Sequence, residues 1–333
     1  MSQPHTQLIL DVDTGIDDSL AILYACASAE AELVAVTCVS GNVPARQVAR
    51  NTLGLLRLTG RDDVEVALGR EVPMVRQLRT APETHGPEGI GYATVPDAAR
   101  PLSDRHAADL IIAEARRRPG ELTLVTLGPL TNLAVGLLRE PELPRLLKQL
   151  VMMAGSYRSA GNTAPTTEWN VAVDPEAMQV VLAGWAAQRD APRPLALGLD
   201  VTERAKLTPD HLADLRSRAG APADHPLLRF VDDALRFYME FHSRFDGFYG
   251  AFIHDALAVA AALDPSLIRT EALSVEVELG GTWTTGETVT DWRRSWGRPP
   301  NLDVALEADV ATFLERFVDR LAGLAAARSG VAK

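Results

Sequence analysis

The stretch Gln7-Leu-Ile-Leu-Asp-Val-Asp-Thr-Gly-Ile-Asp-Asp18 decides the fold, because it joins a strand to a helix through an acidic turn. The apolar run 8–10 is typical of a buried strand, and the run 20–27 is typical of a helix. In open α/β sheets, ligands bind where strands end and helices begin. Four carboxylates crowd this turn: Asp11, Asp13, Asp17 and Asp18. They repel one another unless a cation lies among them, and a hard metal ion with oxygen ligands is the simplest such cation.

Strand-like and helix-like runs alternate along the rest of the chain. Further strand-like runs lie at 33–39, 64–68, 122–127, 150–153 and 195–199, with helical patterns at 45–58 and 107–118 between them. The segment 202–250 is mostly helical in pattern, 274–291 alternates like two antiparallel strands, and 309–327 predicts a final helix. We therefore expect one α/β domain over residues 1–333, with a core at about 7–327. A mainly parallel, Rossmann-like central sheet would be flanked by helices, with a small antiparallel addition near the C-terminus.

Several predicted strands end in polar or glycine-containing turns. These turns contain Asp13, Asn42, Gly128 and Gly155. Because parallel strands end at the same edge of a sheet, we expect these turns to line one pocket.

Composition limits the possible partners. The 333 residues carry a formal net charge of −11, which argues against binding to nucleic acid. The two cysteines lie in apolar stretches and imply no disulfide framework. No apolar run has the length of a membrane span, and the first residues lack the pattern of a signal peptide. The sequence therefore favours a cytoplasmic protein with no membrane partner.

The acidic stretch resembles the N-terminal signature of the inosine–uridine-preferring nucleoside hydrolase family, usually written D-x-D-P-G-x-D-D. Thr14 stands where proline is commonest, which we expect to affect only the rigidity of the turn. Further resemblances follow in the family's order, to about residue 325: Val39-Ser-Gly-Asn42, Thr84-His-Gly-Pro-Glu-Gly-Ile-Gly91, Leu127-Gly-Pro-Leu-Thr-Asn132, Met153-Ala-Gly155, Gly161-Asn162, Glu168-Trp-Asn170, Asp174-Pro-Glu-Ala177 and Ile253-His-Asp-Ala-Leu257. The resemblance implies a nucleoside hydrolase-like fold.

The resemblance also implies an activity and a cofactor. The family hydrolyses the N-glycosidic bond of ribonucleosides, giving ribose and a free purine or pyrimidine base. The resemblance implies a Ca²⁺ ion held by Asp13, Asp18, Asp255 and the backbone carbonyl of Leu127. Ribose hydroxyls and a water would complete its coordination shell. Oxygen-only ligands suit calcium and argue against zinc. Asp13 would also remove a proton from the attacking water.

The remaining site residues are carried over from the same motifs. Asp17, Asn42, Asn162, Glu168 and Asn170 are expected to bind the ribose hydroxyls, and Asp11 to orient the loops beneath them. Met153 and Trp169 are expected in the wall of the pocket.

The sequence specifies the residues at the base-binding end of the pocket less clearly. His254 is the expected proton donor to the departing base, although a core histidine bonded to a carbonyl would have the same sequence. His85, Tyr238 and His242 are expected near the base, and His242 is equally typical of a helix surface.

Two alternatives stay open from the sequence. One is a protein that binds a nucleoside or ribose without turnover, and the other is a hydrolase of a non-standard ribosylated base. The family also implies a role in purine or pyrimidine salvage and assembly as a homodimer or homotetramer.

Overall fold

The structure is a computed structural model that describes residues 5–222 and 224–328. An eight-stranded sheet forms the centre of the molecule. The strand order is β3-β2-β1-β4-β5-β6-β12-β9, and every neighbouring pair is parallel except β12 and β9. The strands are β1 (Thr6–Val12), β2 (Ala31–Cys38), β3 (Glu65–Leu68), β4 (Leu122–Thr126), β5 (Gln149–Met153), β6 (Leu195–Leu197), β9 (Ile268–Leu273) and β12 (Leu302–Ala308). Two small antiparallel pairs lie outside it, β7 (Lys206–Leu207) with β8 (Ala251–Phe252) and β10 (Val275–Val277) with β11 (Thr288–Thr290).

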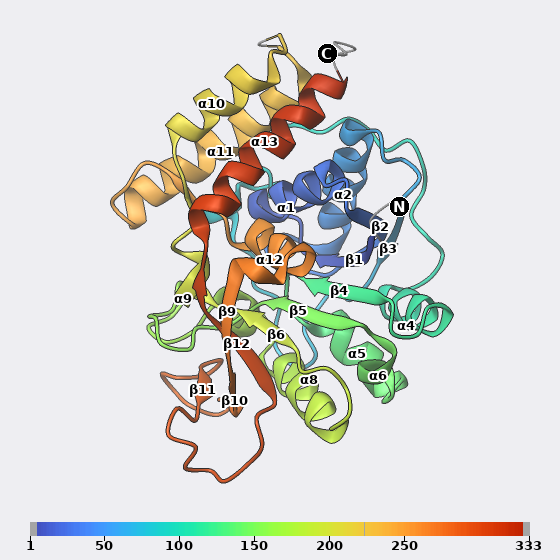
Figure 1. The fold of residues 1–333 in the computed structure, drawn as a ribbon, viewed down its shortest axis with the longest axis vertical. Helices are drawn as coiled ribbons and strands as arrows, with labels where there is room; N and C mark the ends of the chain where they lie inside the picture. The colour runs from blue at the N-terminus through green and yellow to red at the C-terminus, as the bar shows by residue number, and fades with distance from the viewer. Residues whose placement is uncertain (1–4, 223, 329–333) are drawn as a thin grey trace.

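Helices cover both faces of the sheet, as Figure 1 shows. One layer consists chiefly of α1 (Ile16–Ala27), α2 (Ala45–Thr59), α10 (Pro209–Ala219), α11 (Pro226–Phe245), α12 (His254–Leu263) and α13 (Val310–Arg328). The other consists chiefly of α4 (Ala107–Arg117), α5 (Thr131–Arg139), α6 (Leu143–Leu146) and α8 (Pro175–Ala187). Short helices α3 (Pro82–His85), α7 (Trp169–Val173) and α9 (Leu199–Thr202) and a 3₁₀ turn (Pro265–Leu267) complete the set.

The central strand β1 feeds both hydrophobic layers. Leu8 and Leu10 pack into the cluster under α1 and α12, whereas Ile9 packs into the cluster under α4 and α5. This alternation follows from the period of two along a strand. A strand buried on both faces reads as a continuous apolar run, which is why residues 8–10 were recognisable in the sequence.

Strand order places a crevice beside β1. The chain builds β2 and β3 on one side of β1 and then crosses to β4 and β5 on the other side. Such a reversal opens a space at the carboxyl ends of the two strands, where α/β proteins bind ligands. Asp13 follows β1 and Leu127 follows β4, so both residues lie at this position.

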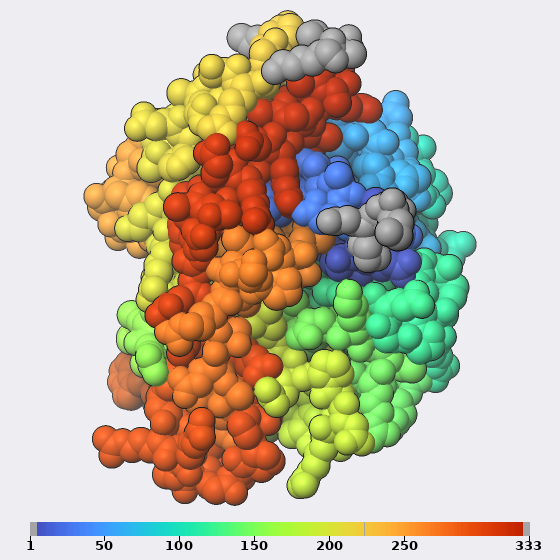
Figure 2. Space-filling model, viewed as in Figure 1, coloured from blue at the N-terminus to red at the C-terminus, as the bar shows by residue number. Residues whose placement is uncertain are grey.

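The C-terminal helix α13 closes one face of the molecule. It packs against α1 and α10, and Figure 2 shows it, in red, running across this surface. None of the helices in residues 5–222 and 224–328 combines the length and apolarity needed to span a bilayer.

The predicted architecture is confirmed, with two differences. Leu199 lies in α9 rather than in a strand, because β6 ends at Leu197. Strand β9, at one edge of the sheet, and strand β12 beside it were not predicted. β9 has one buried residue and β12 mixes buried with partly exposed residues, so neither gives the continuous apolar run of the doubly buried strands. The expected domain limits at 1 and 333 lie outside the described residues.

Candidate active site

The acidic turn gathers four buried carboxylates at the carboxyl end of β1. β1 ends at Val12 and α1 begins at Ile16, so Asp13 lies in the turn while Asp17 and Asp18 lie in the first helical turn. Asp255 joins them from the first turn of α12. All four side chains are at most 4% exposed. Residues separated by more than two hundred positions therefore share one site.

Asp18 is held by backbone and side-chain donors. Its Oδ1 accepts from the N–H of Asp13 at 3.1 Å, and its Oδ2 accepts from the N–H of Gly15 at 3.0 Å and from Asn42 Nδ2 at 3.2 Å. This arrangement caps α1, and the helix dipole stabilises an acid there. A carboxylate has about four lone-pair sites, so about one remains for a ligand.

Asp13 is fixed on one side and free on the other. Its Oδ2 accepts from the N–H of Asn42 at 2.7 Å, whereas its Oδ1 is buried without a partner. Two glycines crowd it: a Cβ on Gly41 would lie 2.0 Å from Oδ2, and one on Gly128 would lie 2.8 Å from Oδ1. Both turns therefore exclude side chains, and the free oxygen stays available to a ligand.

Asp17 ties the site to α12. Its Oδ2 accepts from the N–H groups of His254 at 2.9 Å and of Asp255 at 3.2 Å. Its Oδ1 is buried without a partner, like Oδ1 of Asp13. A buried acceptor without a donor costs about 1–3 kcal/mol, so two in one cluster indicate a ligand-binding surface.

The buried carboxylates also repel one another, which destabilises their charged forms. Burial raises the pKa of Asp13, Asp17 and Asp255 well above the ordinary range, and the charge of Asp18 raises each pKa further. Glu168 adds to the same effect on the pKa of Asp255. A cation in this cluster would offset both burial and repulsion.

Asp11 lies beneath the cluster. Its Oδ1 accepts from Thr37 Oγ1 at 2.6 Å and from Asn132 Nδ2 at 2.8 Å, and Oδ2 is buried without a partner. Burial raises the pKa of Asp11 to about 7, against the opposing effect of these two hydrogen bonds. Asn132 also donates to the carbonyl of Cys38, so Asp11 links the ends of β1, β2 and α5.

A second group of polar side chains comes from the segment around α7. Asn170 Nδ2 donates to the carbonyl of Leu127 at 2.6 Å and to that of Met153 at 3.0 Å. Glu168 accepts from three backbone N–H groups, those of Gly155, Asn170 and Val171. The ends of β4 and β5 are thereby joined to α7.

Asn162 lies on the loop before α7. Its Oδ1 accepts from the N–H of Trp169 at 3.0 Å, and the indole Nε1 of Trp169 is buried without a partner. Arg79 lies over the Trp169 ring, 5.6 Å from its centroid. Sequence analysis did not single out Arg79, because an isolated arginine in a loop carries no recognisable pattern.

These groups border a cavity of about 550 Å³. Two ends of different chemistry can be distinguished. The polar end is lined by Asp17, Asn42, Leu127, Met153, Asn162, Glu168, Asn170 and Asp255, and the aromatic end by His85, Glu203, Tyr238, Phe241, His242, Phe245, Asp246, Phe252 and His254. Every predicted ribose- and base-contacting residue borders this cavity. Asp13 and Asp18 lie beneath its floor, fully buried.

The aromatic end is built largely by one face of α11. Tyr238, His242 and Asp246 follow one another at intervals of four residues, so their side chains share that face. The Tyr238 and His242 rings lie 4.5 Å apart, and the His85 ring lies 5.5 Å from Tyr238. Sequence analysis missed Asp246, although the four-residue interval after His242 was a signal that could have found it.

His254, at the start of α12, borders the aromatic end and is the neighbour in sequence of Asp255 at the polar end. Its Nδ1 is 2.8 Å from Thr202 Oγ1, so the bonded partner is a hydroxyl rather than a carbonyl. Burial lowers the pKa of His254 to about 3, and burial likewise lowers the pKa of His85 to about 3. The two rings are therefore uncharged in this environment.

The donor set fits a hard cation. The unpartnered oxygen of Asp13, the remaining site on Asp18, the Asp255 carboxylate and the Leu127 carbonyl are all oxygen ligands of the kind that calcium takes. Within the described parts of the chain, no three acidic, histidine or cysteine side chains are already clustered as a metal-binding group.

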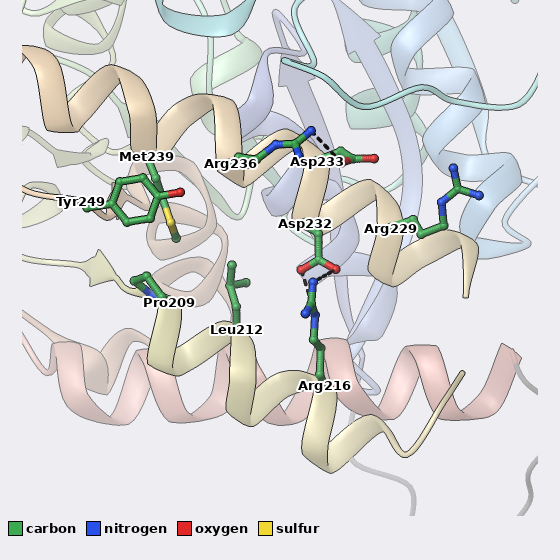
Figure 3. A pocket seen from close by; sticks show the side chains of 9 residues that line it. All are labelled: Pro209, Leu212, Arg216, Arg229, Asp232, Asp233, Arg236, Met239 and Tyr249. Carbon is green, nitrogen blue, oxygen red and sulfur yellow. Dashed lines mark hydrogen bonds and ion pairs between the residues drawn. The ribbon is translucent and has the colours of Figure 1, made fainter. Parts of the chain in front are cut away.

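A second hollow of about 530 Å³ lies between α10 and α11, away from the cluster (Figure 3). Arg216 on α10 pairs with Asp232 on α11, and Arg236 pairs with Asp233 along α11. Among the described residues that line it, none has a buried polar side-chain atom without a partner. Its charges are largely satisfied within the protein.

Comparison with known families decides the relationship. The model of the family described as inosine-uridine preferring nucleoside hydrolase matches residues 8–315. The chain belongs to this family. As a nucleoside hydrolase, it is an enzyme that acts on N-glycosidic bonds.

Three relatives show how far the similarity extends. The nucleoside hydrolase is 36% identical over 316 residues to the pyrimidine-specific ribonucleoside hydrolase RihA of Enterobacter sp., covering 95% of this chain and 97% of the relative. It is 36% identical over 320 residues to the inosine-uridine preferring nucleoside hydrolase of Leishmania major, with coverages of 95% and 97%. The solved structure of a purine-preferring ribonucleoside hydrolase from Gardnerella vaginalis superposes with a TM-score of 0.89 at 33% identity, covering 96% of this chain and 99% of that one.

The similarity confirms the family resemblance and the fold expected from the sequence. Members of the nucleoside hydrolase family are generally metal-dependent, in keeping with the oxygen-rich cluster at the end of β1.

Proposed function

We propose that this nucleoside hydrolase cleaves ribonucleosides in a calcium-dependent reaction in which Asp13 activates the attacking water. The observation that carries the proposal is the pair of buried, unpartnered oxygens, Asp13 Oδ1 and Asp17 Oδ1, beside a cavity with one polar and one aromatic end. A ribonucleoside has the same division between a hydroxyl-rich sugar and a flat base.

Calcium would be held by Asp13, Asp18 and Asp255 and by the carbonyl of Leu127. When bound, such an ion would polarise the attacking water and the ribose hydroxyls. Because every donor is an oxygen, calcium suits the set better than zinc does. Asn170 already donates to the Leu127 carbonyl, which fixes that oxygen at the edge of the cavity.

Asp13 is the proposed general base. Its Oδ2 is occupied by the N–H of Asn42, so the carboxylate is oriented with Oδ1 open to accept a proton from water. The Gly41 and Gly128 backbones approach this carboxylate so closely that neither position has room for a side chain. A fixed base and a bound sugar make the attack effectively intramolecular.

The polar end would bind the ribose. Asp17 offers Oδ1, and Asn42 has a buried Oδ1 without a donor, so both can accept from sugar hydroxyls. Asn162, Glu168 and Asn170 supply further donors and acceptors from the α7 side. The negative charge of this end would also favour the oxocarbenium-like sugar of the transition state.

The aromatic end would receive the base. His85, Tyr238 and His242 provide flat or polarisable surfaces for a ring, and Met153 forms part of the wall. His254 borders the same cavity, and it would hydrogen-bond to the departing base. The relatives include proteins named for pyrimidine and for purine preference, so base choice has to be measured.

A panel of nucleosides assayed for released reducing sugar tests the proposal. Inosine, uridine, cytidine, adenosine and guanosine are offered with calcium, and calorimetry measures binding to the same compounds. Ribose release from at least one supports the proposal. Binding without turnover would favour a binding protein instead, and turnover only of unusual ribosylated bases would shift the substrate class.

Location in the cytoplasm, a role in nucleoside salvage and assembly as a homodimer or homotetramer belong to the same proposal. Cell fractionation tests the first, growth on nucleosides tests the second, and light scattering tests the third.

A further inference from the structure

The His242–Asp246 pair is the one histidine–carboxylate pair among the described residues that line the active-site cavity. His242 Nδ1 lies 2.7 Å from Asp246 Oδ2, one helical turn further along α11. An ionised carboxylate only accepts hydrogen bonds, so Nδ1 carries a hydrogen. The remaining nitrogen, Nε2, is buried and has no partner, and His242 is one of the residues that line the cavity.

His254 lacks such a partner. Its Nδ1 meets the neutral Thr202 hydroxyl, whose hydrogen can also be donated to the carbonyl of Gly198 at 3.2 Å. His85 accepts the N–H of Ile16 on Nδ1, at 3.1 Å. Neither the His254 ring nor the His85 ring contacts an anion directly. A protonated His242 ring, in contrast, would lie against the Asp246 carboxylate.

We propose that His242, held and charged by Asp246, is the acid that protonates the departing base. The inference rests on the proposed nucleoside hydrolysis and assigns the leaving-group proton within it. As the C1′–N bond breaks, its electron pair goes to the base. The proton on Nε2 then moves to a nitrogen or exocyclic oxygen of the base, which leaves His242 neutral.

The step balances over the whole turnover. Water bonds to C1′ and gives one proton to Asp13, while His242 gives one proton to the base. Asp13 later returns its proton to solvent, and His242 takes one back. That proton returns to Nε2 from solvent after the base has left, while Nδ1 keeps its hydrogen on Asp246.

Two opposing effects act on the protonation of His242. Burial lowers the pKa of His242 overall, and the contact with Asp246 opposes that shift, so Asp246 is the group that stabilises the protonated ring. The other titratable groups that face it are Tyr238 on the same helix, His85 on α3 and His254 on α12. Lys206 lies beyond the Phe248 and Phe252 rings, and Glu203 lies near Asp246.

Three phenylalanines pack around the His242 ring. The His242 ring meets Phe241 at 5.3 Å, Phe248 at 5.6 Å and Phe252 at 4.8 Å between centroids. These rings leave Nε2 no protein acceptor, so a base entering between them would be the partner that this nitrogen lacks.

The test varies the leaving group. His242→Gln keeps a donor for Asp246 but cannot carry a mobile proton, so kcat/KM on a natural nucleoside should fall about 100-fold or more. On 4-nitrophenyl β-D-ribofuranoside, whose phenolate leaves without protonation, the loss should stay under about tenfold. His211→Gln is the control, since His211 pairs with Thr208 on α10 away from the cavity. Equal losses of His242→Gln on both substrates would overturn the proposal.

Asp246→Asn provides a second, more exposed variant. Removing the anion lowers the pKa of His242, so the decline of kcat at high pH should begin at lower pH than in the wild type. NMR of the ¹⁵N-labelled imidazole should show the same direction of shift, independently of turnover. An unchanged pH profile and an unchanged imidazole titration would overturn the assignment. Failure of the wild-type protein to release ribose from any nucleoside would instead sink the proposed function.

Discussion

Two hollows of nearly equal volume, about 550 and 530 Å³, differ in how their charges are satisfied. Between α10 and α11, arginines and aspartates pair with one another. At the end of β1, carboxylates are buried together, and Asp13 and Asp17 each keep an oxygen without a donor. Size therefore does not identify the active site. A group of unpartnered polar atoms around one cavity is the better guide, because a ligand can supply the partners that they lack.

Removal of the cation should have the largest effect. Chelation followed by dialysis should abolish ribose release, and calcium should restore it, because the acidic cluster needs a positive charge at its centre. Calcium at about 100 times its Kd should also raise the free energy of unfolding by about 2.7 kcal/mol. Full activity of the metal-free protein would remove calcium from the proposal.

Loss of the proposed base should come next. Asp13→Ala should lower kcat by about 10³-fold or more, because it removes both a base and a cation ligand. Asp13→Asn keeps an acceptor for the N–H of Asn42 and removes one charge from a repulsive cluster. We expect its thermal midpoint without metal to be no lower than that of the wild type.

The second hollow, between α10 and α11, supplies the matched control for the two Asp13 variants. Asp232→Asn removes an aspartate whose Oδ1 accepts from Arg216 Nε at 3.1 Å, outside the active-site cavity. It should leave kcat/KM unchanged and cost at most about 1 kcal/mol, as a partly exposed ion pair does. Comparable loss of turnover in the Asp232 and Asp13 variants would end the distinction between the two hollows.

A change in the sugar should have an intermediate effect. 2′-Deoxyuridine lacks a hydroxyl that the polar end is built to bind, so its kcat/KM should be about 100-fold below that of uridine or lower, since buried acceptors would stay unpaired. Paired steady-state assays of the two compounds measure this. Equal rates would show that the unpartnered oxygens do not recognise the 2′ position.

His254→Ala should have the smallest of these effects on the site. Its loss should affect purine and pyrimidine nucleosides unequally, by about tenfold between inosine and uridine, since the two bases present different atoms. Kinetics of both substrates with one enzyme preparation give the ratio. An equal loss on both would argue for a structural role of the bond to Thr202.

The polar end could be predicted from the sequence because its residues are grouped. Asp13, Asp17 and Asp18 belong to one strand–turn–helix unit, and the end of a parallel strand fixes where such a unit points. Asp255 and Leu127 were assigned only through the family resemblance. A lone acid on α12 and a backbone carbonyl carry no pattern of their own.

The aromatic end could be predicted only in part. Tyr238 and His242 were identified by a loose spacing, while Asp246, Phe252 and Arg79 were not identified. Side chains from α11 and from loops meet there through tertiary packing, and no local rule fixes the distance of α11 from the sheet. Strands β9 and β12, the last two at one side of the sheet, were recognised only in the structure, because neither gives a continuous apolar run.

The hydrogen bonds from His254 and Asp255 to Asp17 join positions 237 and 238 residues apart. A nascent chain therefore carries its acidic turn through most of synthesis without the helix that completes it. An N-terminal fragment ending before α12 would hold three of the four clustered acids and lack Asp255, so we expect it to be inert. On this proposal the enzyme becomes competent only after α12 has been synthesised and has docked beside α1.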